Sequence, residues 1–218
     1  MKATLLRLSL AAAAAMVVTG ANAADLPRPV YKGPAYVAEP LFSWTGFYIG
    51  ANAGYGFGKS DWSGFGASPS PKGFVGGGQI GYNDQIGSFV FGLEGDYDYS
   101  AMKGDAACPG GTCTTKNTWL ATGRGRIGYA FDRFLPYFTG GVAFGSIKAE
   151  HTLLGNASSN RTGYALGGGL EYAFLGAWSV RAEYLYVDLG SFDAGPAPLV
   201  NNIGFKANVV RAGINYRF

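Results

Sequence analysis

The chain contains few charged residues and no long apolar run beyond its N-terminus. Charged residues make up 14% of its 218 positions, against about a quarter in a typical soluble domain. The net charge of +3 is small, and the charges are scattered, so no nucleic-acid partner is expected. After the N-terminal segment, no stretch approaches the roughly 18 apolar residues of a transmembrane helix, which excludes such helices.

Glycine and aromatic residues are abundant instead. The chain has 36 glycines, and 15% of its residues are aromatic. The glycines do not follow the three-residue period of collagen, so a fibrous protein is excluded. The two cysteines and the single histidine leave little material for a metal site or a catalytic base.

The N-terminus carries the features of a secretory signal peptide. Lys2 and Arg7 precede an apolar run over residues 8–18, and Ala21-Asn22-Ala23 forms a small-residue cleavage site. We predict cleavage after Ala23. Residues 24–44 then hold four of the ten prolines and are predicted to form an irregular periplasmic lead segment. An exported product without transmembrane helices is either soluble or a β-barrel.

From residue 45 to 218 the dominant period is two. In "GFYIGANAGYGFG" (46–58), apolar residues alternate with small or polar ones, as in a β-strand. The pattern recurs near 73–84, 89–102, 117–130, 136–148, 162–174, 178–189 and 204–218. Short connections alternate with long ones around 59–72, 103–116, 149–161 and 190–203. These features predict an all-β, eight-stranded antiparallel up-and-down transmembrane barrel, with four long extracellular loops and short periplasmic turns.

The charges within strands distinguish a membrane barrel from a soluble, lipocalin-like one. Those near the strand centres lie opposite the more apolar face and are all Asp, Glu or Arg, while the lysines lie in loops or at strand ends. A solvated surface would be rich in lysine. The guanidinium group of arginine suits enclosed pairing with carboxylates, so we predict a lumen charge network and a lipid-facing apolar face. Two clusters are expected. The first contains Glu94, Asp96, Asp98, Arg124 and Arg126, and the second, nearer the closing seam, contains Glu171, Arg181, Glu183, Arg211 and Arg217.

Aromatic residues recur at both ends of the apolar faces. Phe89 and Tyr99 are one such pair, and similar pairs occur on three other predicted strands. About ten residues of tilted strand span about 25 Å, which is the height of the apolar band of an outer-membrane barrel. The spacing therefore predicts two aromatic girdles at the membrane interfaces.

Several stretches resemble one known family. "FSWTGFYIGANAGYGFG", "GFVGGGQIGYNDQIGSFVFGLEGD", "RGRIGYAFDRFLPYFTGGVAFG" and "RAGINYRF" are similar to the alphaproteobacterial outer-membrane protein β-barrel family, often labelled outer-membrane immunogenic or porin-family proteins. The resemblance implies an abundant eight-stranded barrel of the bacterial outer membrane, in contact with lipid and lipopolysaccharide. The aromatic C-terminus, with Tyr216 and Phe218, resembles the signal read by the barrel-assembly machinery. The protein is expected to be a monomer or a weak oligomer.

Cys108 and Cys113 in "CPGGTC" are candidates for a disulfide, because the chain is exported and the turn between them can bring them together. No further metal ligands lie near them, so we expect neither a metal nor another cofactor. His151 lies beside Glu150 and Thr152 at a loop base, a position more typical of a solvated side chain than of a catalytic base. An enzyme is therefore not expected.

Three functions remain in competition. The first is a structural barrel with a charge-filled lumen, which would contribute to envelope integrity and present its surface loops, as a surface antigen does. The alternatives are a porin for small solutes and a protein whose extracellular loops bind haem or another ligand, with His151 or a loop tyrosine as the haem ligand. Relatives of both kinds have been described, so the resemblance does not decide between them.

Overall fold

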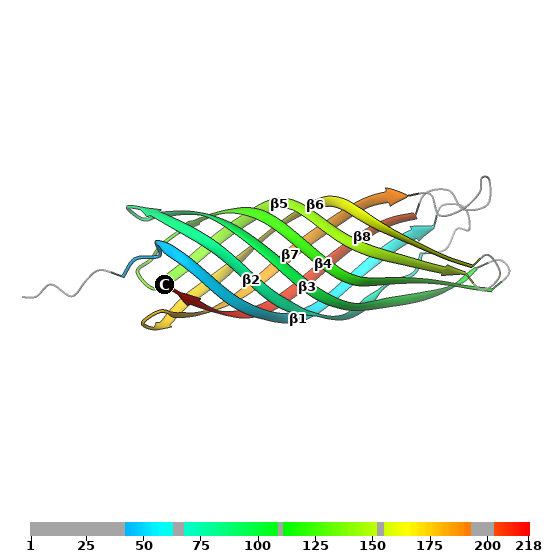
Figure 1. The fold of residues 1–218 in the computed structure, drawn as a ribbon, viewed down its shortest axis with the longest axis horizontal. Coiled ribbons are helices and arrows are strands. Elements are labelled where there is room, and N and C mark those ends of the chain that lie inside the picture. The colour runs from blue at the N-terminus through cyan, green and yellow to red at the C-terminus, as the bar shows by residue number, and fades with distance from the viewer. Residues whose placement is uncertain (1–41, 63–67, 109–110, 152–154, 193–202) are drawn as a thin grey trace, which may run out of the picture. The chain divides into compact units, whose positions relative to one another are not determined.

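The computed structural model describes residues 42–62, 68–108, 111–151, 155–192 and 203–218 (Figure 1). The predicted signal peptide, and the lead segment up to residue 41, lie outside these residues. Within the described residues, no helix has the length and apolar character needed to cross a membrane.

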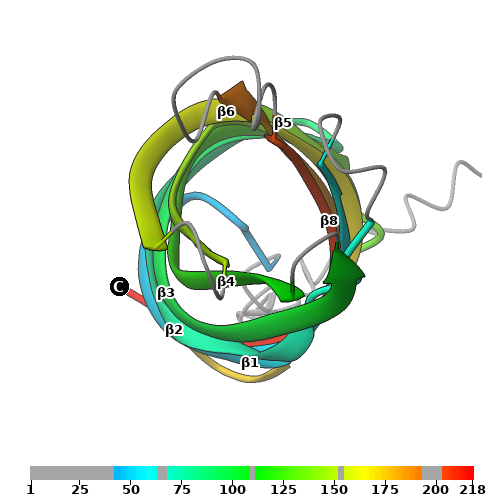
Figure 2. The ribbon, with the colours of Figure 1, turned by 90° about the vertical axis from the view of Figure 1, so that its right-hand side faces the viewer.

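Eight antiparallel strands form one closed sheet. They are β1 (Gly46–Trp62), β2 (Lys72–Ile86), β3 (Phe89–Cys108), β4 (Gly111–Tyr129), β5 (Phe134–His151), β6 (Gly155–Leu175), β7 (Trp178–Phe192) and β8 (Ile203–Arg217). Each strand pairs with its neighbours in sequence, and β1 also pairs with β8 (Figures 1 and 2). The predicted all-β, eight-stranded antiparallel up-and-down barrel is confirmed. The short β2–β3, β4–β5 and β6–β7 turns lie at the same end as the C-terminus (Figure 1), which defines the periplasmic end.

Alternation along the strands separates the two faces. On β1, Phe47 and Ile49 are exposed on the outside, whereas Tyr48 and Asn52 are buried inside the barrel. Gly54 also faces inward, where a Cβ atom would lie 2.6 Å from the Cα atom of Arg211 on β8. Glycine at this position therefore lets the two strands approach closely beside a large inward side chain.

Two of the four predicted extracellular loops are mostly strand, so the predicted ranges 103–116 and 149–161 were wrong as loops. β3 and β4 continue pairing up to Cys108 and Gly111, and β5 and β6 pair up to His151 and Gly155. The residues of these ranges include Gly, Ser and Asn, which are typical of loops, yet they pair because the barrel below already sets the register of each hairpin. Polar residues on both faces suit strands that extend into water.

The β3–β4 hairpin is further linked by polar side chains outside the membrane-spanning part. The hydroxyl group of Thr114 donates a hydrogen bond of 2.6 Å to Asp105, and this bond holds the pKa of the Asp105 carboxyl below its usual value. Lys116 on β4 forms an ion pair of 2.7 Å with Glu150 on β5. Side-chain contacts therefore continue between these strands beyond the apolar band.

The lipid-facing surface has small residues between its two aromatic girdles. On β3, for example, Gly95 lies midway between Phe91 and Tyr99 on the outward face. Every strand has an outward glycine or alanine near its middle: Ala51, Gly78, Gly95, Gly123, Gly140, Gly168, Ala182 and Ala212. Several are in register on neighbouring strands, including Gly95 with Gly123 and Ala182 with Ala212. We call these eight residues the small-residue belt.

Candidate functional site

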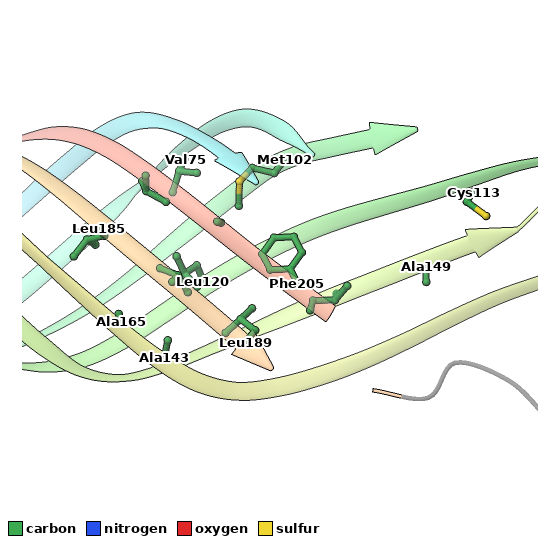
Figure 3. Close-up of a cluster of buried hydrophobic side chains, with 14 residues drawn as sticks. Val75, Met102, Cys113, Leu120, Ala143, Ala149, Ala165, Leu185, Leu189 and Phe205 are labelled. Carbon is green, nitrogen blue, oxygen red and sulfur yellow. The ribbon is translucent and has the colours of Figure 1, made fainter. Parts of the chain in front are cut away.

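The interior of the barrel is divided into three layers. At the periplasmic end, the buried residues Trp44, Val90, Ala130, Leu135 and Ala173 form an apolar layer. A polar, charged layer follows. The extracellular half is mainly apolar, with Val75, Met102, Leu120 and Phe205 converging from β2, β3, β4 and β8 (Figure 3). It also buries a few uncharged polar side chains, such as Ser60 and Thr115.

In the structure, charged side chains occupy only the middle layer of the lumen, so the predicted filling by charges does not extend to the other two layers. On β7 the inward positions Arg181 and Glu183 are followed by the buried Leu185 and Val187. The inward face thus changes from charged to apolar along one strand. The sequence interpretation assigned the better apolar face to lipid and had no signal for a second, internal apolar layer.

Arg124 on β4 lies at the centre of the charged layer. Its guanidinium group forms ion pairs with Glu94 at 2.5 Å, with Asp96 at 2.8 Å and with Glu183 at 2.5 Å. Its Nε atom donates a hydrogen bond to Thr122 at 2.8 Å, and Thr122 donates one to Asp96 at 2.6 Å. Because Glu183 lies on β7, this single side chain joins β3, β4 and β7.

Two further arginines connect the opposite wall to the same carboxylates. Arg211 on β8 lies 2.7 Å from Asp98, 3.1 Å from Glu183 and 3.2 Å from Asp96. Arg181 on β7 forms an ion pair with Glu94 on β3 and lies 3.5 Å from Glu183. The side chains of all these residues are at most 2% exposed.

Arg126 forms the periplasmic side of the network. It lies 2.7 Å from Glu171 on β6, and its guanidinium carbon lies 4.2 Å from the ring centre of Tyr137. Tyr48 accepts a hydrogen bond from Arg126 at 3.2 Å and donates one to Glu94 at 2.6 Å. Arg126 and Tyr48 therefore connect Glu171 with the centre of the network.

A chain of amide side chains completes the layer. Asn52 donates to Gln79 at 2.8 Å, Gln79 to Asn215 at 2.7 Å, and Asn215 to Glu171 at 2.8 Å. These residues, together with Tyr48, were not predicted from the sequence, because only charged residues were considered. Their positions on the inward, small-or-polar face of the alternation were the signal available.

The structure brings nine of the ten predicted lumen charges into one network. The two clusters expected from the sequence are joined, because Arg124 reaches Glu183 and Arg181 reaches Glu94 across the lumen. Arg217 differs from the other nine. It is half-buried at the periplasmic end, and its guanidinium carbon lies 4.5 Å from the ring centre of Phe42.

The charge balance of this layer is uneven. Five carboxylates, Glu94, Asp96, Asp98, Glu171 and Glu183, face four guanidinium groups, Arg124, Arg126, Arg181 and Arg211. Burial raises both the attraction between opposite charges and the desolvation cost of each one, so every charge depends on its partners. The layer contains many donors matched to acceptors, and its clearest chemical role is to hold the strands together.

The remaining predicted residues lie away from this layer. Cys108 and Cys113 are joined by a disulfide at the end of the β3–β4 hairpin, with Cα atoms 5.8 Å apart. The backbone of His151 ends β5, and its side chain lies outside the described part of the structure. Phe218 is 78% exposed, and its N–H group donates to the carbonyl oxygen of Phe47 at 2.9 Å. Among the described residues, no group of three or more His, Cys, Asp or Glu side chains is arranged to hold a metal ion.

A closed barrel with an apolar, aromatic-girdled exterior and a polar layer buried inside is the architecture of a transmembrane β-barrel protein. Residues 9–218 match the family described as "Outer membrane protein beta-barrel domain", and the chain belongs to this family. Its location is the bacterial outer membrane.

Named relatives agree with this assignment. The "31 kDa outer-membrane immunogenic protein" of Brucella melitensis is 38% identical over 237 residues, covering 96% of this chain and 98% of that protein. The "22 kDa outer membrane protein" of Rhizobium leguminosarum bv. viciae is 36% identical, covering 83% of this chain and 81% of that one. Among solved structures, Neisserial surface protein A matches with a TM-score of 0.49 and 21% identity, covering 80% and 98% of the two chains.

Proposed function

We propose that the protein is a structural barrel that maintains outer-membrane integrity and presents its extracellular hairpins at the cell surface. The observation that supports this most directly is the buried network of ion pairs across the lumen. Arg124 to Glu183 and Arg181 to Glu94 cross between strands that are not neighbours in the sheet. Apolar layers lie on both sides of these pairs.

The free energy needed to open the lumen favours a structural role over a pore. An eight-stranded barrel has an interior just wide enough for side chains to fill. A solute path would require at least one buried ion pair to separate, and breaking such a pair costs about 3–5 kcal/mol. Even the lower value would keep the lumen open for less than about one part in a hundred of the time.

Planar-bilayer conductance of the refolded protein tests this proposal. We expect no steady unitary current from the unmodified protein. A double variant, Arg124→Ala with Arg126→Ala, removes two of the central guanidinium groups and should raise conductance or lower the resistance of the barrel to heat. Large, steady unitary currents from the unmodified protein would establish the porin function instead.

Surface presentation is supported by the two long hairpins and by the relatives named as immunogenic proteins. A deletion strain should become more sensitive to detergent and should regain resistance when the full-length gene is returned. The proposal that the protein is not an enzyme is tested by incubation with lipopolysaccharide, where release of acyl chains would contradict it. Haem binding by the loops is tested by absorbance titration, with His151→Ala as the variant that should lose any signal.

A further inference from the structure

A groove on the lipid-facing surface runs across β2 to β6 and has a volume of about 600 Å³. Gly125 and Gly140, which pair in register on β4 and β5, form its floor. Leu93, Ile127, Phe138 and Leu166 form its walls. One end contains Tyr82 and Asp84, at the level of the periplasmic aromatic girdle, and the other reaches the small-residue belt.

The groove exists because two neighbouring strands lack side chains where their neighbours project far outward. A Cβ atom added to Gly125 would have only the carbonyl oxygen of Gly140 within 4 Å, at 3.9 Å. The adjacent wall residues Leu93 and Phe138 are 72% and 76% exposed. In the membrane this exposed space is filled by lipid hydrocarbon, so a long acyl chain is the natural occupant of the floor.

Asp84 is the exposed charged residue of the groove, because the side chain of the other charged lining residue, Arg126, is buried in the lumen and paired with Glu171. Its side chain is exposed on the outward face of β2, opposite Phe91 of β3. No lysine or arginine among the described residues forms an ion pair with it. At the level of the membrane interface, a carboxylate is stabilised by a cationic partner that donates hydrogen bonds, and it repels an anionic partner.

We propose that this groove binds one aminophospholipid of the periplasmic leaflet. The primary ammonium group of the lipid would donate hydrogen bonds to the Asp84 carboxylate, and one acyl chain would lie over Gly125 and Gly140. The end of the groove that holds Asp84 is the end with the short turns, so it faces the periplasmic leaflet. This site goes beyond the structural role proposed above, because it assigns a specific ligand class to the outer wall.

A second copy of the chain is a less suitable occupant. Most closed dimers are twofold symmetric and place the same surface of each subunit in the interface. Such a dimer over this groove would bring two Asp84 carboxylates into one interface without a compensating cation. The charge at the end of the groove therefore favours the lipid.

Native mass spectrometry of the protein released from nanodiscs can test the site. The nanodiscs would contain equal amounts of phosphatidylethanolamine and phosphatidylglycerol with matched acyl chains. We expect the unmodified protein to retain one phosphatidylethanolamine with about a tenfold preference, as one charge-assisted hydrogen bond would provide. Asp84→Asn should abolish the preference, and Gly140→Leu, which fills the groove, should lower retention of the lipid about tenfold.

Two controls keep the test decisive. Gly78→Leu adds the same side chain to the small-residue belt outside this groove, and it should retain the preference of the unmodified protein. Phosphatidylcholine, which keeps the positive charge but has no N–H donors, should be retained less than phosphatidylethanolamine by the unmodified protein, and this comparison needs no variant. The proposal would be wrong if the unmodified protein retained all three lipids equally or if Asp84→Asn had no effect. It would also be wrong if the protein retained no lipid but formed a dimer that Gly140→Leu abolishes.

Discussion

Replacing Arg124 by methionine should destabilise the barrel more than any surface charge replacement. The methionine side chain has a similar length but offers no donors to the three carboxylates around it. Glu94 would keep Arg181 and Tyr48, and Asp96 would keep Arg211 and Thr122. Five buried carboxylates would then share three guanidinium groups.

The expected loss follows from the burial of these charges. The side chains of Arg124, Asp96 and Glu183 are 0% exposed, so water cannot replace the lost partner. Removing one member of a buried pair costs about 3–5 kcal/mol. By contrast, the pair between Lys206 and Asp188 is 3.7 Å long and has a lysine that is 59% exposed, so Lys206→Met should cost at most about 1 kcal/mol.

Urea titration of the protein refolded into lipid vesicles, followed by tryptophan fluorescence, would measure both free energies of unfolding. Combining Arg124→Met with Glu183→Gln should recover part of the loss, because it removes one of the excess carboxylate charges while Arg181 and Arg211 keep their other partners. If Arg124→Met stayed within about 1 kcal/mol of the unmodified protein, the idea that this network stabilises the barrel would be wrong.

Three further predictions concern the wall and its ends. Gly77→Val should lower the free energy of unfolding by about 1–3 kcal/mol, because its Cβ atom would lie 2.7 Å from the Cα atom of Asp98. Gly78→Val should be tolerated, because its Cβ atom would have no neighbour closer than 3.6 Å, and equal losses for the two variants would contradict this reasoning. Deleting Phe218 should slow membrane insertion, measured by the gel-mobility shift on folding, yet change stability little because the residue is 78% exposed; normal insertion would refute the assembly-signal prediction. Cys108→Ser should increase protease cleavage at the end of the β3–β4 hairpin while leaving barrel unfolding unchanged, and a lowered barrel stability would show that the disulfide acts beyond that hairpin.

The strand number and the two faces could be predicted because they depend on local alternation. Phe47 and Tyr48 point to opposite sides of the sheet whatever the rest of the chain does. The closed barrel followed from eight such segments joined by alternately short and long connections. The inward direction of the charges near the strand centres was inferred from the absence of lysine among them, since the lysines lie toward the strand ends.

The partners of those charges could not be predicted in the same way. Arg124 and Glu183 are 59 residues apart and meet across the lumen, and their meeting depends on strand tilt and on the reach of both side chains. The apolar extracellular half of the lumen was hidden for another reason. Around Leu185 and Val187 both faces of β7 are largely apolar, so the alternation no longer distinguishes inside from outside. The hairpin lengths were missed because turn-forming composition does not prevent pairing.

The buried charges and the small-residue belt occupy adjacent positions in the chain. Gly95 lies between Glu94 and Asp96, and Ala182 lies between Arg181 and Glu183. In mechanical terms, the wall is thinnest where the ion pairs brace it from within. Lateral pressure from the bilayer that would flatten the barrel must therefore strain ion pairs that cross its diameter. The barrel should consequently resist flattening most strongly at the level where its wall is thinnest.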